Sequence, residues 1–384
     1  MNVSGADVIV VGGGIVGTAA AAFLTDAGMR VVLVEREGLA AGASGANSGV
    51  VQQPFDPILV GLYRDTVALY RELSAAGVGF RLPDTPAGML FLAEDESAAR
   101  RYAESVTQAF PTLGVEVLEG RTLQEFEPSL GPNLWACLVE TGYPVVPAGS
   151  TYVYATLAEA GGAIVRLGRS AVPVFRGDSA IGVRVDEQLL EADAVLIAAG
   201  PWTSALLDPT GRWLPIRALW GVVVEADLAD PPLHPLEEAS IEAAIGVRDE
   251  PDQSGQVRVG GDLPTAELDF SLVPQLPSSA VGSTFLDEEP DPRKWIEPIL
   301  LRAMRYVPRL VDAPIRGVRA CARPQSADGR PLIGQVPGRN SLFVCAGHGP
   351  WGISTGPASA RLVVDLILGK DPTVAPAFEP ARLI

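Results

Sequence analysis

The segment Val8–Glu35, VIVVGGGIVGTAAAAFLTDAGMRVVLVE, decides the fold that the sequence predicts. Val8–Val11 is a short apolar run of the kind that forms a buried parallel strand. Thr18–Ala27 is rich in alanine and favours a helix, and Gly28 stands where the cap after that helix is expected. Val31–Val34 is a second apolar run. Together these segments predict one β-α-β unit.

Three glycines follow the first strand with the spacing Gly12-x-Gly14-x-x-Gly17. In such a turn the first glycine permits a tight bend, the second lets a pyrophosphate approach the backbone, and the third lets the helix pack closely on the strand. Glu35 ends the second strand, where a carboxylate suits the ribose hydroxyls and would repel a 2′-phosphate. The pattern therefore predicts a dinucleotide site rather than a chance glycine turn. Its residues are Gly12, Gly14, Ile15, Val16, Gly17 and Glu35.

A glycine turn of this kind suits NAD or FAD, and the loop that follows it separates the two. Residues 36–49 are mostly small and include the sequence Gly42-Ala43-Ser44-Gly45-x-Asn47-x-Gly49. An NAD-binding fold normally continues directly into its next helix, whereas small residues let a loop pass along the pyrophosphate and the flavin edge. A flexible linker is the alternative interpretation. We predict FAD, contacted by Arg36, Ala43, Ser44, Asn47, Ser48, Gly49 and Val50.

Helical and extended patterns alternate along the rest of the chain. Helices are predicted at Pro57–Ala76, Glu96–Ala109, Ser150–Ala160, Trp295–Tyr306 and Ser354–Leu368, and strands at Gly88–Ala93, Ala163–Arg166, Ala192–Ala199, Ala218–Asp227, Gln256–Gly260 and Ser341–Cys345. Residues 228–292 are rich in proline and acid, and we expect loops there.

The apolar strands expected in the nucleotide-binding sheet lie at both ends and in the middle of the chain. This arrangement predicts a mixed α/β (α+β) fold with two discontinuous domains. One is a Rossmann-like FAD-binding domain formed by residues 1–85, 146–217 and 315–384. The other is an antiparallel-sheet, substrate-binding domain formed by residues 86–145 and 218–314.

Four segments together resemble the superfamily of D-amino-acid oxidase, glycine oxidase and sarcosine oxidase. They are the N-terminal turn, the Gly42–Gly49 loop, the strand end Gly200-Pro201-Trp202 and the C-terminal block after residue 316. The resemblance covers nearly the whole chain and is closest to the glycine oxidase-like branch. It implies that Gly200 and Trp202 also contact the cofactor.

Within the C-terminal block, Arg319–Gly334 reads RACARPQSADGRPLIG. In the proteins that it resembles, an Arg-Pro pair shortly before Asp-Gly-x-Pro holds the substrate carboxylate, and by this match the arginine is Arg323. A guanidinium suits that role because its planar fork can pair with both carboxylate oxygens. A surface salt bridge is the ordinary alternative, and Arg319 is the second candidate.

Cys321 in the same block corresponds in place to the flavin-linking cysteine of monomeric sarcosine oxidase. The Ala-Arg-Pro sequence beside it resembles the branch without a covalent link. A buried structural cysteine is the ordinary alternative. We therefore expect FAD to be bound non-covalently.

The segment Ala346–Thr355, AGHGPWGIST, follows an apolar strand and opens a helix. Its glycines let backbone N–H groups approach a planar ligand, and a helix N-terminus favours the negative charge of reduced flavin. The residues expected at the cofactor are Gly349, Trp351, Gly352, Ile353 and Ser354. His348 either hydrogen-bonds the flavin or caps local backbone, and we group it with Arg323 as a candidate catalytic residue.

The resemblance implies an enzyme that oxidises the C–N bond of an amine bearing a carboxylate: glycine, an N-substituted glycine or a D-amino acid. Hydride transfer to flavin N5 would give an imine, which hydrolyses to an oxo acid and an amine. Reoxidation by oxygen is favoured over reoxidation by an electron-acceptor partner. One alternative is an FAD-binding subunit of a multi-subunit opine or hydroxyproline dehydrogenase. Another is an NAD-dependent dehydrogenase.

Composition narrows the partners and the compartment that we expect. The formal net charge is -17, so a nucleic-acid partner would need a basic stripe, which the sequence lacks. No apolar stretch is long enough to span a bilayer. Three cysteines form no disulfide framework and fit a cytoplasmic protein. We expect no metal site, and homo-oligomerisation stays open.

Overall fold

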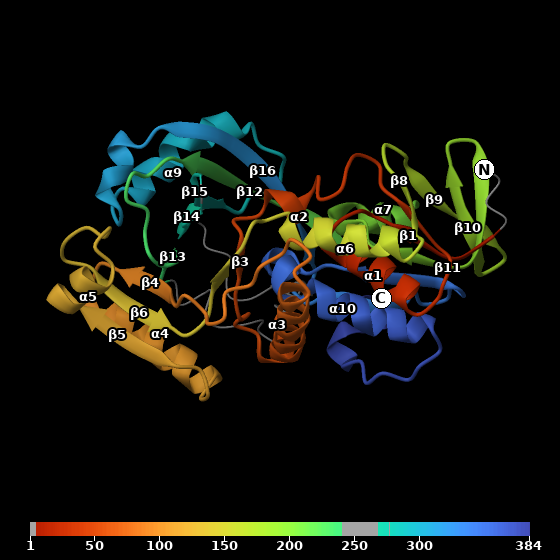
Figure 1. Ribbon diagram of the computed structural model, residues 1–384, viewed down its shortest axis with the longest axis horizontal. Helices are drawn as coiled ribbons and strands as arrows, with labels where there is room; N and C mark the ends of the chain where they lie inside the picture. Colours follow the sequence, from red (N-terminus) through yellow and green to blue (C-terminus); the bar gives the residue numbers. More distant parts are fainter. Residues whose placement is uncertain (1–4, 240–267, 276) are drawn as a thin grey trace.

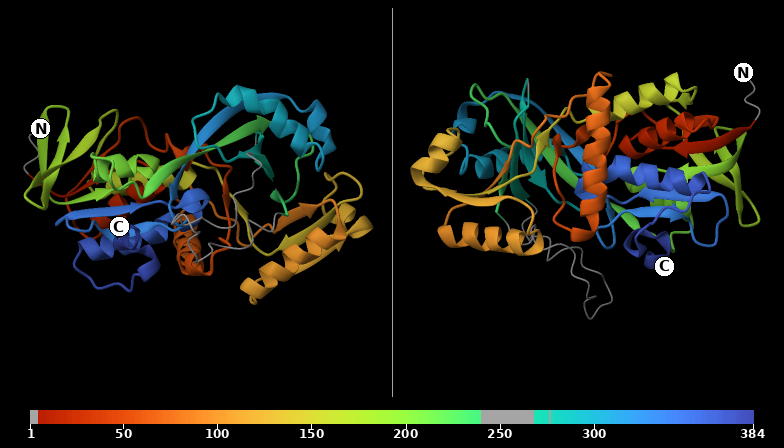
Figure 2. Two further views of the ribbon diagram at one scale, coloured as in Figure 1. Left: turned by 180° about the vertical axis from the view of Figure 1, so that it is seen from behind. Right: turned by 60° about the horizontal axis from the view of Figure 1, so that its bottom comes forward.

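Two sheets lie side by side along the long axis of the molecule (Figures 1 and 2). The computed structural model describes residues 5–239, 268–275 and 277–384. The first sheet is largely parallel and the second is largely antiparallel, which confirms the mixed α/β fold that the sequence predicts. No helix within these ranges is long and apolar enough to cross a membrane.

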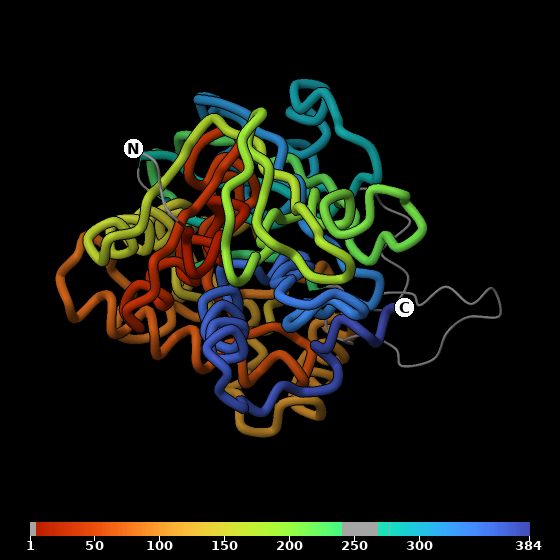
Figure 3. The backbone as a smooth tube through the Cα atoms, turned by 90° about the vertical axis from the view of Figure 1, so that its right-hand side faces the viewer, coloured from red at the N-terminus to blue at the C-terminus, as the bar shows by residue number. Residues whose placement is uncertain are grey.

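The first sheet has the strand order β17-β18-β11-β1-β2-β8, with the β9–β10 hairpin extending from β11. The strands are β1 (Ala6–Val11), β2 (Val31–Val34), β8 (Ile164–Arg166), β9 (Ala171–Arg176), β10 (Ser179–Val185), β11 (Gln188–Ile197), β17 (Leu332–Gln335) and β18 (Leu342–Ala346). The pairs β18·β11, β11·β1, β1·β2 and β2·β8 are parallel. Seen along the long axis, the hairpin lies in front of this sheet (Figure 3).

Helices α1 (Ile15–Asp26) and α10 (Gly352–Ile367) pack beside one another on the first sheet, with α6 (Gly149–Ala160) against α1 and α3 (Val60–Ala75) against α10. The run Ala19–Ala22 on α1 is buried, and these small side chains let α6 and α10 approach closely. The strand residues Val8 and Val10 belong to the same apolar core. This packing brings the N-termini of α1 and α10 to the same cavity.

The second sheet has the strand order β16-β12-β15-β14-β13-β4-β6-β5 and is antiparallel except at β13·β4. Its strands are β4 (Met89–Ala93), β5 (Val115–Glu119), β6 (Trp135–Val139), β12 (Ile216–Ala226), β13 (Leu236–Glu238), β14 (Leu268–Val273), β15 (Ser279–Thr284) and β16 (Ile315–Ser326). Helix α9 (Ile296–Ala303) lies near β14 and β15, and α4 (Glu96–Ala109) and α5 (Gly120–Phe126) lie near β5 and β6.

Short elements complete the chain. The strands β3 (Val50–Val51) and β7 (Tyr143–Pro144) pair separately. The short helices are α2 (Ala43–Ala46), α7 (Thr203–Leu207), η1 (Pro57–Leu59), η2 (Gly200–Trp202), η3 (Pro292–Trp295), η4 (Pro308–Asp312), η5 (Gly349–Trp351), η6 (Pro376–Phe378) and η7 (Pro380–Leu383).

The long predicted elements are present, and the prediction of loops over residues 228–292 is wrong. Strands β13, β14 and β15 all lie within that segment. Their burial overrides the local proline and acidic content, because each strand pairs with chain segments far away in the sequence. The predicted strand Gln256–Gly260 lies outside the described residues. The domain boundaries remain a prediction; β16, which we grouped with residues 315–384, pairs with β12 of the second sheet.

Candidate active site

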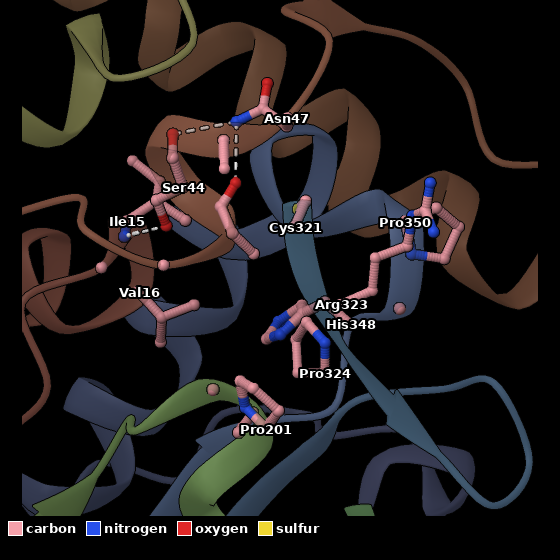
Figure 4. A pocket seen from close by; sticks show the side chains of 18 of the residues that line it. Ile15, Val16, Ser44, Asn47, Pro201, Cys321, Arg323, Pro324, His348 and Pro350 are labelled. Atoms are coloured by element: carbon pink, nitrogen blue, oxygen red, sulfur yellow. Dashed lines mark hydrogen bonds between the residues drawn. The ribbon is translucent and has the colours of Figure 1, made fainter. Parts of the chain in front are cut away.

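A cavity of about 630 Å³ lies where the two sheets meet, and it collects residues from both ends of the chain. Ile15, Val16 and Ser44 lie on one side of it, and Cys321 and Arg323 on the other (Figure 4). The predicted cofactor residues that line it are Gly12, Gly14, Ile15, Val16, Glu35, Arg36, Ala43, Ser44, Asn47, Ser48, Val50, Gly200, Trp202, Gly349, Trp351, Gly352, Ile353 and Ser354. Arg323 and His348 line it as well, whereas Gly17 and Gly49 do not.

The glycine turn has the geometry that its spacing predicts. Gly12 has a φ of +117°, and a Cβ there would lie 2.3 Å from the carbonyl oxygen of Ala198. Gly17 lies behind the turn, where a Cβ would be 2.0 Å from the Gly12 oxygen. Gly14 lines the cavity, where a Cβ would lie 3.0 Å from Ser44 Oγ. The start of α1 can therefore present backbone N–H groups to an anion, with Ile15 N–H already bound by Ser44 Oγ at 2.9 Å.

Glu35 ends β2 with its carboxylate at the turn. Its Oε2 accepts a hydrogen bond from Gly13 N–H at 2.6 Å, and its Oε1 accepts one from Glu37 N–H at 2.8 Å. A carboxylate has about four acceptor positions, so it can still accept bonds from hydroxyl groups. The Arg36 guanidinium stacks on the Trp202 ring, 4.0 Å from its centre, at the same cavity wall.

The loop after Glu35 is a fixed structure rather than a flexible linker. Asn47 Nδ2 donates to the carbonyl oxygens of Ala43 and Ser44, and its Oδ1 accepts from Gly49 N–H at 2.8 Å. Arg319 donates to the carbonyl oxygen of Asn47 at 2.9 Å from the second sheet. Asn47 and Gly49 therefore shape the loop, and the cavity meets mainly its backbone and small side chains.

His348 lies at the opposite wall, just before η5 and α10. Its ring is 2% exposed, and its Nε2 has no hydrogen-bond partner within the part of the chain that the structure describes. Burial lowers the pKa of His348 to about 4, so the imidazole is neutral at physiological pH. An orphaned ring nitrogen facing a cavity leaves room for a ligand hydrogen bond, which the alternative of capping local backbone does not explain.

Arg323 reaches over the face of the second sheet into the cavity. Its Nη1 donates to the carbonyl oxygen of Thr284 at 2.9 Å, and its Nη2 donates to Ser283 Oγ. Within the described ranges no carboxylate pairs with it, and burial lowers its pKa. A guanidinium has five N–H donors, so several remain available. Arg319 differs, because it forms an ion pair with Glu225 and donates two further hydrogen bonds to the carbonyl oxygens of Ala46 and Asn47.

Three polar residues that sequence reasoning missed also line the cavity: Gln52, Glu237 and Asp269. Burial, followed by the charge of Asp269, raises the pKa of Glu237 to about 8. Burial, followed by the neighbouring Glu238, raises the pKa of Asp269 to about 7. The alternation of Leu268–Val273, LDFSLV, is a strand signal that could have placed Asp269 on a sheet.

A family model described as "FAD dependent oxidoreductase" matches residues 7–366 of this chain. The chain belongs to this FAD-dependent oxidoreductase family. It is 28% identical to a glycine oxidase of Pseudomonas aeruginosa over 97% of this chain and 98% of that protein. A glycine oxidase of Pseudomonas putida is 25% identical over 96% of each chain. The chain is thus an FAD-dependent oxidoreductase, and FAD is its cofactor.

Solved structures of family members share the whole architecture. Glycine oxidase of Geobacillus kaustophilus superposes with a TM-score of 0.81 at 25% identity, covering 99% of both chains. An iminodiacetate oxidase of a Chelativorans species superposes with a TM-score of 0.75 at 23% identity, covering 97% of this chain and 98% of that one. At that lower identity the likeness concerns the fold alone. The glycine cradle, two helix N-termini and the orphaned His348 nitrogen all fit a dinucleotide with a flat ring system.

Proposed function

We propose that this chain oxidises the C–N bond of a small amine that bears a carboxylate: glycine, an N-substituted glycine or a D-amino acid. The observation that carries the proposal is Arg323, a partly buried guanidinium in the cavity whose hydrogen bonds within the described residues go to a hydroxyl and a backbone carbonyl oxygen, and which stacks on the Phe285 ring. A partly buried cation without an anion is costly, and a substrate carboxylate would supply the missing charge.

The cofactor-binding residues form the other half of the proposal. The turn Gly12–Gly17, with Glu35, would hold the dinucleotide, and the loop 42–49 would follow it toward the ring. Bound FAD would supply a hydride acceptor, so that the neutral amine loses hydride (two electrons and one proton) to give an iminium ion, which loses a proton to form the imine; water then converts it to an oxo acid and an amine. His348, neutral and with a free Nε2, would hydrogen-bond the ring or the substrate.

The protein contributes position and environment to this reaction. Arg323 would fix the carboxylate, and therefore the carbon beside it, relative to the ring. A largely apolar cavity favours the neutral amine, the form that can lose hydride. No acid or base on the protein is required. We propose oxygen as the electron acceptor, as in the glycine oxidases that match the whole chain. The multi-subunit alternative is not favoured on that ground.

The test is anaerobic mixing of the purified flavoprotein with glycine, N-methylglycine, D-alanine and D-lysine while flavin absorbance is followed. Bleaching is expected with at least one of them and not with methylamine, which lacks the carboxylate. Arg323→Ala should keep its flavin but raise KM by about 30-fold or more, since removing one partner of a buried charge pair costs roughly 2–5 kcal/mol. Arg121→Ala, on an exposed residue of α5, is the matched control.

Failure of every carboxylated amine to bleach the flavin would overturn the proposal, as would unchanged kinetics in Arg323→Ala. Admitting oxygen then tests the acceptor. Peroxide should form in proportion to the substrate consumed by the isolated chain. If the flavin bleaches but is not reoxidised by oxygen, a partner-dependent dehydrogenase is indicated instead.

A further inference from the structure

The cavity has a second polar end, across the sheet from Arg323. Glu237 on β13 and Asp269 on β14 line that end. Arg323 donates to Ser283 on β15, and in the strand order β15-β14-β13 this serine is two strands away from Glu237. Asp269 lies on β14, the strand beside Ser283, so at about 4.8 Å between strands the backbone of Asp269 is about 5 Å from that of Ser283, and the backbone of Glu237 is about 10 Å away.

This second end holds hydrogen-bond acceptors and two carboxyl groups that are poorly stabilised as anions. Burial raises the pKa of both Glu237 and Asp269, so their ionised forms are poorly stabilised. Within the described ranges neither carboxyl forms an ion pair. The nearby Arg302 pairs with Glu238 instead, at 2.6 Å. Arg302 only partly opposes the rise in the pKa of Asp269, and Arg323 forms its hydrogen bonds with Ser283 and Thr284, so a cation on a ligand would stabilise the ionised carboxylates.

Gln52 adds an independent observation at the same place. Gln52 is 6% exposed, and its amide lowers the pKa of the neighbouring Glu237 carboxyl against the effect of burial. Gln52 Oε1 has no donor among the residues that the structure describes. A buried acceptor without a partner is rare in folded proteins. Gln52 therefore points to a ligand that brings N–H donors to the acidic end.

We propose that the acidic end formed by Glu237, Asp269 and Gln52 binds a second, cationic group of the substrate, an ammonium or guanidinium remote from the carboxylate. The identity of Arg323 as the carboxylate site rests on the proposed function. A distal cation would give Gln52 Oε1 its donor and would stabilise both carboxylates through charge-assisted hydrogen bonds. The substrate class is then a basic amino acid, or a glycine whose N-substituent ends in a cation.

Binding can be tested apart from oxidation with ligands that carry no amine beside their carboxylate. Calorimetric titration of the holoenzyme with 4-aminobutanoate, 6-aminohexanoate and 8-aminooctanoate would be compared with butanoate, hexanoate and octanoate. In each pair only the terminal ammonium differs. The aminated member of at least one pair should bind at least tenfold more tightly, and the length of the preferred pair reports the distance between the carboxylate site and the acidic end.

Glu237→Gln and Asp269→Asn keep the side-chain shape and remove the charge. Each should bring the affinity ratio of the preferred pair toward one, while Glu116→Gln, on an exposed residue of β5, should keep it. Retained flavin content and melting temperature would show that the variants fold. Equal affinity within every pair for the wild type, or an unchanged ratio in both cavity variants, would overturn the inference.

The two proposals fail separately in this design. If the carboxylated amines bleach the flavin but no ligand pair differs in affinity, the acidic end does not bind a cation and the oxidation proposal stands. If no amine bleaches the flavin but the aminated acids bind more tightly through Glu237, the site stands and the oxidation proposal fails.

Discussion

The Arg323 guanidinium occupies the space that a side chain at Gly221 would fill. A Cβ on Gly221 would lie 2.3 Å from Arg323 Nη2 and 2.4 Å from Nη1. Gly221 is on β12 opposite Cys321, and Arg323 is two residues further along β16. The absence of a side chain at residue 221 thus lets the guanidinium lie flat over the sheet and reach Ser283 and Thr284.

Gly221→Ala should therefore displace Arg323 without unfolding the protein. The clash involves the end of a flexible side chain, so we expect little change in the melting temperature. KM for the carboxylated amine should rise about tenfold, corresponding to a loss of about 1.4 kcal/mol in binding. Steady-state kinetics and thermal melting check both parts. Gly61→Ala, at an open position on α3, is the control, and an unchanged KM in Gly221→Ala would contradict the positional role.

Gly17→Ala should loosen the cofactor by a different route. A Cβ at residue 17 would meet the Gly12 carbonyl oxygen at 2.0 Å, and a backbone atom cannot swing away. Separating α1 from the turn should destabilise the fold by roughly 1–3 kcal/mol, as overpacking usually does. The measurement is the ratio of bound flavin to protein, together with the melting temperature. Gly38→Ala, where a Cβ would meet nothing, should be neutral in both; full flavin occupancy in Gly17→Ala would refute the prediction.

Cys321 should not be linked to the flavin. It faces the cavity from β16, but burial raises the pKa of its thiol, and the thiolate is the reactive form. The neighbouring guanidinium groups of Arg323 and Arg319 only partly oppose this rise. After acid precipitation all yellow colour should stay in the supernatant. A fluorescent protein band in a denaturing gel that vanishes in Cys321→Ala would show the reverse.

The cofactor half of the site could be predicted because its signals are local. Strand β1, the glycine turn and α1 are consecutive, so their spacing alone fixes which groups meet. The roles of Gly12 and Gly17 need only short-range sterics. The same holds for the start of α10, whose glycines and apolar strand adjoin it in the sequence.

The substrate half depends on register between distant strands, which one sequence does not reveal. Arg319 and Arg323 look alike in the sequence, and they differ because Arg319 meets Glu225 on β12. Glu237 lies on a strand of three residues beside prolines, where local propensity predicts a loop. Its place in the cavity follows from pairing with β4 and β14, segments far away in the chain.

His348 makes stability depend on pH in a defined direction. Burial lowers its pKa to about 4 from an ordinary value near 6.5, so between these values the unfolded chain binds a proton that the folded chain does not. Stability from this residue is therefore complete above about pH 6.5 and is lost as the pH falls toward 4. Glu237 and Asp269 act in the opposite sense, because their pKa values are raised and the folded state holds their protons. The contribution of His348 to the pH dependence is therefore isolated by the difference in free energy of unfolding between the wild type and a variant without this histidine.

Replacing His348 with Asn removes the titration and keeps a polar side chain at residue 348. The free energy of unfolding of the wild type, minus that of the variant, should fall by about 2 kcal/mol between pH 7 and pH 4.5. Urea unfolding of the apoproteins at both pH values measures this difference without contribution from bound flavin. Because Glu237 and Asp269 are present in both proteins, their titration cancels. A difference that stays constant with pH would mean that the His348 ring is protonated in the folded state and has a partner.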